Sequence, residues 1–210
     1  GRMNLAYFPD ARGRILTEMS VMAHGPDHFM LITAAAAQWH DRDLLLADKP
    51  AGITVSDRTR DFSTLIVTGP KARDLFGALG TEADLTLPWL SVQQAVVGGI
   101  ACGLARVSFA GELGWEIHAA TAEIPALYEA VLGAGARPFG MFALDSLRIE
   151  KGYRAWKGDL STDYSLFEAG LDRFVRLDKP QDFPGKDALT AEAVAGPTKR
   201  FVTLVVETGE

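Results

Sequence analysis

The first third of the chain alternates apolar and polar positions with the period expected of strands. Residues 15–23 and 28–33 are rich in Ile, Leu, Val and Met, and a turn cluster lies between them at residues 24–27. Residues 34–48 then form an Ala- and Leu-rich stretch without Gly or Pro, which predicts a helix. This part of the chain therefore reads as a β-meander followed by a helix.

The rest of the chain continues to mix strand and helix patterns. Short β-branched runs indicate strands, while Gly, Pro and Thr at their ends mark turns and helix starts. The predicted strands are residues 53–56, 64–68, 93–99, 104–109, 115–119 and 174–177, and the predicted helices are residues 70–80, 121–132, 143–151 and 185–193. Because hairpin turns dominate the connections, we predict an α+β fold with mostly antiparallel sheets and flanking helices.

Both ends of the chain suggest a piece of a longer polypeptide. Residues 1–7 already have a strand-like pattern, and residues 200–207 have the pattern of a further strand at the end of the given sequence. A lone strand cannot bury itself. We therefore expect this last strand to pair with residues outside the chain or with an earlier part of it.

Composition makes several classes of partner unexpected. The 210 residues are 48% hydrophobic and 23% charged, with a net charge of −6 and no run of Lys and Arg. A nucleic-acid surface needs clustered cations, and a membrane span needs about 20 apolar residues, so we expect neither partner. The single cysteine, Cys102, excludes an internal disulfide and is interpreted as a small buried residue. The four histidines have no ligand spacing, so no metal site is predicted.

Three features could carry chemistry. Glu18 lies in an otherwise apolar or neutral strand, where a carboxylate is most often the polar position of the alternation. Glu112 lies between glycines on a hairpin tip, where it is commonly only a turn residue, although glycines also let a backbone approach a ligand. Between residues 148 and 157 a cation recurs at every third position, with Tyr153 and Trp156 among them. These cations indicate either a solvated helix end or a binding site for the anionic tail of a ligand.

Four ordered segments resemble the glycine-cleavage T-protein, an aminomethyltransferase family. Residues 13–21, GRILTEMSV, resemble the strand that bears the family's catalytic carboxylate. Residues 106–116, RVSFAGELGWE, resemble its glycine–glutamate hairpin. Residues 144–156 and residues 168–171 follow in the expected order. The resemblance covers nearly the whole chain.

Two further segments, residues 154–163 and 183–186, are closer to one branch of this family. That branch is the folate-binding C-terminal region of dimethylglycine and sarcosine dehydrogenases, which are large FAD enzymes. The resemblance implies the aminomethyltransferase folate-binding fold, as a fragment, over residues 1–195, and the first strand of a truncated C-terminal β-barrel domain over residues 196–210. It also implies an upstream FAD domain outside this chain, and a location in the bacterial cytoplasm or, as a second choice, the mitochondrial matrix.

The resemblance further implies tetrahydrofolate chemistry. Family members capture a one-carbon unit, delivered as an iminium from an N-methyl amine, on tetrahydrofolate as 5,10-methylene-tetrahydrofolate. By the resemblance, Glu18 is the catalytic carboxylate, and Glu112 binds the pterin ring, whose N–H groups suit a carboxylate acceptor. The other implied folate contacts are Leu5, Met30, Ile32, Trp156 and Phe174.

The chain departs from the family pattern at several positions. The family carboxylate is normally an aspartate, and the extra methylene of Glu18 lengthens its reach by roughly 1.5 Å, which leaves room for a weaker or different transfer. A tyrosine, an asparagine and an arginine of the family fall at Met30, Ala34 and Leu144, so some folate contacts are rebuilt or lost. A tetrahydrofolate-dependent O- or S-demethylase and a non-catalytic folate-binding domain therefore remain open as alternatives.

Overall fold

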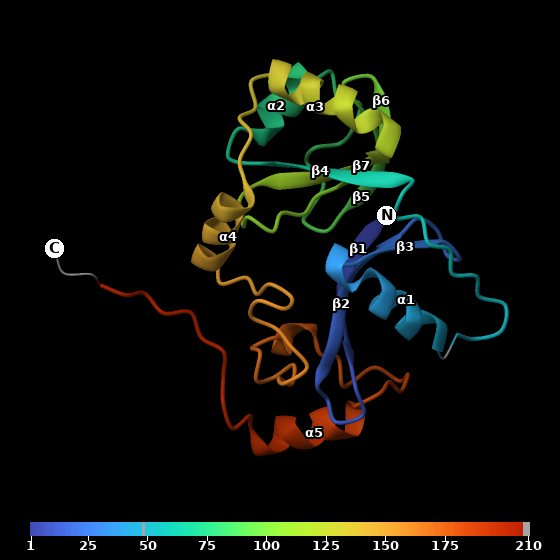
Figure 1. Cartoon of the computed structure of the whole chain (residues 1–210), viewed down its shortest axis with the longest axis vertical. Coiled ribbons are helices and arrows are strands. Elements are labelled where there is room, and N and C mark those ends of the chain that lie inside the picture. Colours follow the sequence, from blue (N-terminus) through green and yellow to red (C-terminus); the bar gives the residue numbers. More distant parts are fainter. Residues whose placement is uncertain (48, 208–210) are drawn as a thin grey trace. The chain divides into compact units, whose positions relative to one another are not determined.

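The chain divides into two compact units (Figure 1). The computed structural model describes residues 1–47 and 49–207. The first unit consists of Gly1–Asn4, Val21–Met30 and Arg42–Lys151, and the second of Leu5–Ser20, Leu31–Asp41 and the chain from Gly152 onward. A three-stranded sheet has the order β1-β2-β3 and contains β1 (Arg2–Pro9), β2 (Ile15–Ala23) and β3 (Phe29–Ile32). Each of these strands contributes residues to both units.

The first unit is built on a four-stranded antiparallel sheet. Its order is β4-β7-β6-β5, with β4 (Phe62–Thr68), β5 (Val92–Val97), β6 (Ile100–Ala105) and β7 (Gly114–Ala120). Gly98 and Gly99 alone connect β5 to β6, with φ values of 57° and 82°. A two-residue hairpin turn needs positive φ at both central positions, which explains the glycine pair.

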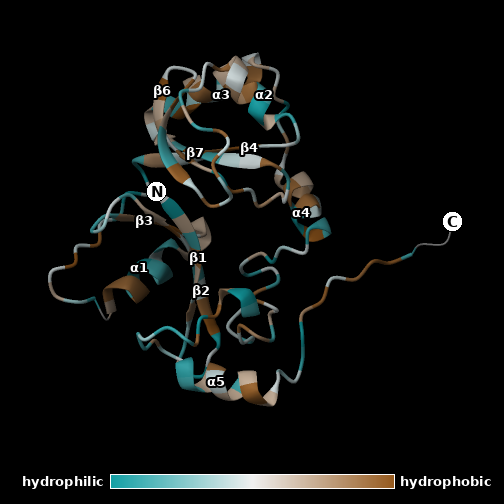
Figure 2. Cartoon of the chain, turned by 180° about the vertical axis from the view of Figure 1, so that it is seen from behind, coloured by the Kyte–Doolittle hydropathy of each residue, from teal (hydrophilic) through white to brown (hydrophobic). Residues whose placement is uncertain are grey.

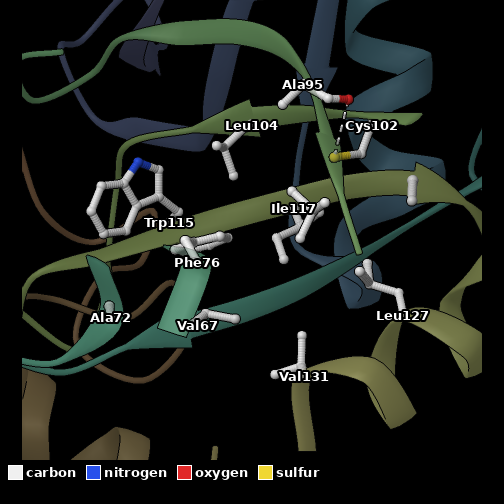
Figure 3. Packing of buried hydrophobic residues seen from close by; sticks show 12 residues of the cluster. Val67, Ala72, Phe76, Ala95, Cys102, Leu104, Trp115, Ile117, Leu127 and Val131 are labelled. Atoms are coloured by element: carbon white, nitrogen blue, oxygen red, sulfur yellow. Dashed lines mark hydrogen bonds between the residues drawn. The ribbon is translucent and has the colours of Figure 1, made fainter. Parts of the chain in front are cut away.

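The core of this unit lies between the sheet and two helices, α2 (Ala72–Ala78) and α3 (Ile124–Gly133) (Figure 3). Trp115, Ile117 and Leu104 of the sheet pack with Phe76 of α2 and Leu127 of α3, and none of these side chains is more than 1% exposed. The Phe76 and Trp115 rings meet edge to face with centroids 5.2 Å apart. Full burial of each such side chain contributes about 1.5–3 kcal/mol, so this cluster dominates the stability of the unit.

The structure confirms that Cys102 is a small buried residue. It is 5% exposed within this cluster, and its Sγ lies 3.7 Å from the carbonyl oxygen of Ala95. Burial raises the pKa of the Cys102 thiol, which keeps it protonated and unreactive.

The second unit has a smaller core beside β2. Ile15 packs with Leu166 and Leu171 of the irregular segment after residue 152, and with Leu189 of α5 (Lys186–Ala195). Within that segment the only named element before α5 is the short helix η3 (Asp172–Phe174). Irregular backbone of this kind depends on side-chain contacts to hold its shape, because it has no ladder of its own.

An ion pair joins this irregular segment to Arg14, the residue before β2. The Arg14 guanidinium contacts the Glu168 carboxylate and donates to the carbonyl of Asp163 at 2.8 Å. The backbone N–H of Ser165 donates to the same carboxylate at 3.0 Å. Glu168 is only 5% exposed, so loss of Arg14 would leave a buried charge with one partner fewer. This contact gives a structural role to the segment 168–171.

The helix α1 (Gln38–Ala47) is preceded by the short helix η1 (Ala35–Ala37). Asp41 at its start is 1% exposed, accepts a hydrogen bond from the Thr33 hydroxyl, and lies 2.9 Å from Nδ1 of His40. His40 itself is exposed. It therefore has the role of a surface histidine that pairs with a buried acid.

The structure confirms the α+β class, the antiparallel sheets and the flanking helices. Residues 15–23 form β2 as predicted, and the predicted strands 28–33, 64–68 and 115–119 agree with β3, β4 and β7 within two residues. The predicted strand 93–99 runs past the end of β5 into the turn at Gly98 and Gly99. The strand predicted over 104–109 was placed four residues too late, because β6 is Ile100–Ala105 and residues 106–109 lie in the loop after it. The helix predicted over residues 34–48 begins later, at Gln38, because Ala35–Ala37 form η1. Residue 48, the last of that predicted helix, lies outside the described residues. The predicted helix at 143–151 is α4 (Met141–Glu150), and the one at 185–193 is α5.

Two predicted strands are wrong, and a third is not formed within the described residues. Residues 53–56 lie in a fully exposed loop, and residues 175–177 follow η3 without joining a sheet. Residues 200–207 form no strand either, and Figure 2 shows apolar stretches along this exposed C-terminal segment. Short β-branched runs become strands only where a partner strand is present, and these three have none within the described residues. The boundary placed after residue 195 and the β-barrel assignment of residues 196–210 stay predictions.

Two helix starts also differ from their predicted positions. Thr121 was expected to cap the helix that follows, but Thr121–Glu123 form a short 3-10 helix and α3 begins at Ile124. The Thr121 hydroxyl instead lies 3.0 Å from the Ser63 hydroxyl. The helix expected to open at Pro70 begins at Ala72, as α2. In both cases a tighter turn precedes the α-helix.

Candidate functional site

Glu18 is a half-buried carboxyl in the middle of β2, within the second unit. Thr17 and Met19, its neighbours along the strand, are buried, because successive strand side chains point to opposite faces. Burial raises the pKa of Glu18 to about 7, and a hydrogen bond with the Tyr7 hydroxyl opposes this rise. Near neutral pH the carboxyl is therefore present in both protonation states. This is the property required of a group that accepts and donates protons.

Tyr7 of β1 is the partner of Glu18, and the sequence pattern did not single it out. Its ring lies against Phe174 of η3, with centroids 5.3 Å apart and planes inclined by 52°. The Arg173 guanidinium lies over the Phe174 ring, 4.7 Å from its centroid. Burial and the Glu18 carboxylate raise the pKa of Tyr7, so its hydroxyl keeps its proton and acts as a donor. A tyrosine in an apolar strand is an ordinary core residue, so no sequence signal marked it.

Trp156 and Phe174 both pack against the apolar core of the second unit. The Trp156 indole Nε1 is buried and has no hydrogen-bond partner among the residues that the structure describes. An orphaned indole N–H is available to the acceptor of a ligand. Leu5 of β1 and Ile32 of β3 belong to the same unit, and both are half-buried.

Glu112 lies in the first unit, on the loop between β6 and β7, where the hairpin tip was predicted. Its side chain is exposed, and it forms no hydrogen bond or ion pair with the described residues. Met30 of β3 belongs to the same unit and is half-buried. The Glu112 carboxylate therefore has all its acceptor positions open to a ligand.

Gly111 has a steric reason to be glycine. Its φ is +76°, and a Cβ at this position would lie 2.5 Å from Cγ of Lys151 and 2.8 Å from Cβ of Lys151. The Lys151 side chain thus passes directly over the turn that carries Glu112. Only glycine satisfies both the backbone conformation and this close approach.

The cations between residues 148 and 157 do not act as one group. Arg148 is 6% exposed and forms an ion pair with Asp145, with Nη2 at 2.6 Å from Oδ1. Arg154 is half-buried and donates to a backbone carbonyl two residues earlier at 2.7 Å. Lys151 and Lys157 are exposed, the first in the first unit and the second in the second. The even spacing therefore does not produce a single cationic stripe of four free charges.

The predicted site residues fall into two sets. Glu18, Leu5, Ile32, Trp156 and Phe174 belong to the second unit, whereas Glu112 and Met30 belong to the first. Within the second unit, the Tyr7 ring packs on Phe174. The Tyr7 hydroxyl also lowers the pKa of Glu18, against the effect of burial. The structure thus assembles a proton-handling carboxyl with aromatic neighbours.

The described residues contain no group of three or more His, Cys, Asp or Glu side chains that could hold a metal ion. Among the same residues no helix combines the length and the apolar character that crossing a membrane requires.

Comparison with known proteins identifies the family of this domain. Residues 1–179 match the GCVT N-terminal domain, so the chain belongs to this family. The crystal structure of the glycine cleavage system aminomethyltransferase T from Bartonella henselae has the same fold, with a TM-score of 0.80 at 24% identity over 94% of this chain and 54% of that chain. The family resemblance inferred from the sequence motifs is thereby confirmed.

The chain is also related to two amine dehydrogenases. It is 35% identical over 219 residues to the mitochondrial dimethylglycine dehydrogenase of Rattus norvegicus, covering 100% of this chain and 26% of that protein. It is 35% identical over 192 residues to the mitochondrial sarcosine dehydrogenase of Mus musculus, covering 87% of this chain and 21% of that protein. The chain thus spans about a quarter of the length of these relatives.

Proposed function

We propose that this chain binds tetrahydrofolate and assists the transfer of a one-carbon unit to it from an oxidised N-methyl amine, giving 5,10-methylene-tetrahydrofolate. The observation that carries the proposal is Glu18, a half-buried carboxyl on a rigid strand whose pKa is raised to about 7. The names of the two amine dehydrogenases support an amine of the dimethylglycine or sarcosine type. Oxidation of that amine, and the FAD it requires, belong to a domain outside this chain.

The side chains of this chain suit a folate in their chemistry. In the first unit, the open Glu112 carboxylate matches the N–H donors of a pterin ring. In the second unit, the orphaned indole N–H of Trp156 can donate to an acceptor of a folate. Leu5, Met30, Ile32 and Phe174 offer apolar surface. When bound, tetrahydrofolate supplies two amine nitrogens that take up the one-carbon unit.

Glu18 is the residue proposed to move the proton. In the overall transfer the iminium carbon gives up its double bond to the amine nitrogen and becomes bonded to two nitrogens of tetrahydrofolate. Each of these two nitrogens loses a proton; one proton leaves on the released amine, and the other goes to solvent. A carboxyl with a pKa near 7 can accept a proton from a nitrogen and return it to the departing amine. Glu18 therefore acts as a shuttle, whereas Glu112 acts as a binding group.

Calorimetric titration of tetrahydrofolate into the chain tests the binding half of this proposal. Glu112→Ala removes a charged hydrogen-bond acceptor, so we expect a Kd weakened by about 10- to 100-fold. Glu129→Ala, an exposed glutamate of α3 in the same unit, is the matched control and is expected to bind like the wild type. An absence of binding by the wild-type chain, or equal binding by Glu112→Ala, would overturn the proposal.

A further inference from the structure

The hairpin between β2 and β3 brings two histidines together within the first unit. His24 follows the last residue of β2, and His28 precedes the first residue of β3. Their rings lie side by side, with centroids 5.4 Å apart and planes inclined by 37°. The sequence predicts no metal site, because its four histidines lack a ligand spacing along the chain. Folding supplies a proximity that this spacing does not show.

The backbone of the turn fixes the two histidines opposite each other. The backbone N–H of His24 donates to the carbonyl of His28 at 2.9 Å, which closes the hairpin. Residues that face each other across antiparallel strands carry their side chains on the same face, with Cβ atoms about 4.5–5.5 Å apart. Pro26, in the turn between them, has a fixed φ and stiffens the connection. The hairpin therefore presents both imidazoles together.

The separation of the two rings suits a shared metal ion. A zinc ion binds an imidazole nitrogen at about 2.0–2.1 Å, and the ring centre lies about 1.1 Å beyond that nitrogen. With a tetrahedral angle at the metal, the centres of two ligating rings are then about 5.2 Å apart. The observed centroid distance of 5.4 Å is close to this value. The pair therefore needs little rearrangement to hold one ion.

Both imidazoles are accessible, and other groups of the chain do not occupy them. The His24 and His28 side chains are exposed, and neither forms a side-chain hydrogen bond or ion pair with the described residues. His118 on β7 differs, because it is 5% exposed, with Nδ1 at 2.9 Å from the Thr64 hydroxyl and Nε2 at 3.2 Å from the Glu116 carboxylate. The two hairpin histidines are thus the ones open to a ligand.

We propose that His24 and His28 together bind one divalent transition-metal ion such as Zn²⁺, through one ring nitrogen of each. Imidazole is a ligand for zinc, copper and nickel, whereas magnesium and calcium take oxygen ligands. The coordination positions that the two histidines do not fill are open to water. A bound ion ties β2 to β3 at the end of the hairpin. This site shares no residue with the proposed function and does not depend on it.

A zinc titration of the tag-free chain at pH 7.5, followed by NMR of the histidine rings, tests the proposal. We expect the His24 and His28 signals to shift together and to saturate at one ion per chain. His24→Gln and His28→Gln should each weaken the Kd for Zn²⁺ by more than about 10-fold, because a single ligand remains. His40→Gln, which removes another exposed histidine, is the matched control and should bind like the wild type.

The same variants distinguish a shared ion from two separate ones. If each single variant kept the affinity of the wild type and lost only half of the bound zinc, the two rings would bind ions independently, and the proposal would be overturned. It would also be overturned if His40→Gln weakened binding as much as His24→Gln, because the ion would then lie elsewhere.

Thermal denaturation gives a second, independent measurement. An ion that binds only the folded hairpin stabilises the folded state, so Zn²⁺ should raise the Tm of the wild type. The rise should be absent in His24→Gln, whose substitution at an exposed position leaves the fold intact. Mg²⁺ at the same concentration should leave the Tm of both proteins unchanged. No rise with Zn²⁺ in the wild type, or an equal rise in His24→Gln, would refute the site.

Discussion

Glu18 and Glu112 carry the same carboxyl group, but the two units give them different surroundings. Glu18 lies on the middle strand of a sheet, half-buried, with its pKa raised to about 7 by burial. Glu112 lies on a loop, exposed, with no partner among the described residues. This difference is the reason for proposing Glu18 for proton transfer and Glu112 for binding, because burial raises the pKa of a carboxyl and exposure leaves a carboxylate open as an acceptor.

The backbone that carries Glu18 is also held by more pairing than the backbone that carries Glu112. The Glu18 strand is paired on both sides, by β1 and β3, which holds a reacting group in place. Glu112 is carried by a turn that depends on Gly111 and on the passage of Lys151 over it. A binding group tolerates small displacements better than a group that must meet a reacting atom.

The largest effect is expected from Glu18→Gln, which keeps the shape of the side chain and removes its proton transfer. We expect the rate of 5,10-methylene-tetrahydrofolate formation to fall by about 100- to 1,000-fold, with tetrahydrofolate binding little changed. The assay supplies tetrahydrofolate and an iminium made by a separate amine-oxidising enzyme, with the uncatalysed rate subtracted. Glu18→Asp retains a carboxyl and should lose less. A Glu18→Gln rate equal to that of the wild type would remove Glu18 from the mechanism.

The next effect concerns stability as a function of pH. Folded Glu18 has a pKa of about 7, above its ordinary value of 4.5. The neutral carboxyl therefore contributes stability that is fully present below about pH 4.5 and is lost as the pH rises through about 7. Between pH 5 and 8 the wild type should lose about 2 kcal/mol of unfolding free energy relative to Glu18→Gln. Urea denaturation of both proteins at pH 5 and pH 8 measures this change. An equal change in unfolding free energy for the wild type and Glu18→Gln would contradict the prediction.

A smaller effect is expected at the turn below Glu112. Gly111→Ala combines a positive φ with a steric conflict against Lys151, so we expect a loss of about 1–3 kcal/mol in unfolding free energy. Gly133→Ala, in a helix with open space at its Cβ position, is the control and should be nearly neutral. In a Lys151→Ala background, Gly111→Ala should lose less unfolding free energy, because only the strain of the positive φ remains. Thermal denaturation of the four variants tests this, and a neutral Gly111→Ala would refute it.

The smallest effect is expected from Glu112→Ala on stability. Because the side chain is exposed and unpaired within the described residues, the free energy of unfolding should change by less than about 0.5 kcal/mol. The same samples used for folate titration provide the measurement. A larger loss would mean that Glu112 supports the turn, and the contrast with Glu18 would then weaken.

Part of this molecule follows from local sequence. The alternation at residues 15–23 corresponds to β2 throughout. This feature depends only on the side-chain period, which neighbouring residues decide. The turn at Gly98 and Gly99 was missed, because the predicted strand 93–99 included both glycines. By contrast, residues 53–56 have the composition of a strand but find no partner in the described structure. Strand formation is decided by pairing, which local composition does not contain.

The sequence by itself therefore determined the α+β class, the family, and the positions of Glu18 and Glu112. Tertiary structure alone decided that Glu18 is the acid whose pKa is raised, that Tyr7 and Phe174 accompany it, and that Arg148 is already paired with Asp145. The physical reason is the same in each case. Burial, ring packing and hydrogen bonding join residues that are distant in sequence, and these contacts exist only once the chain has folded.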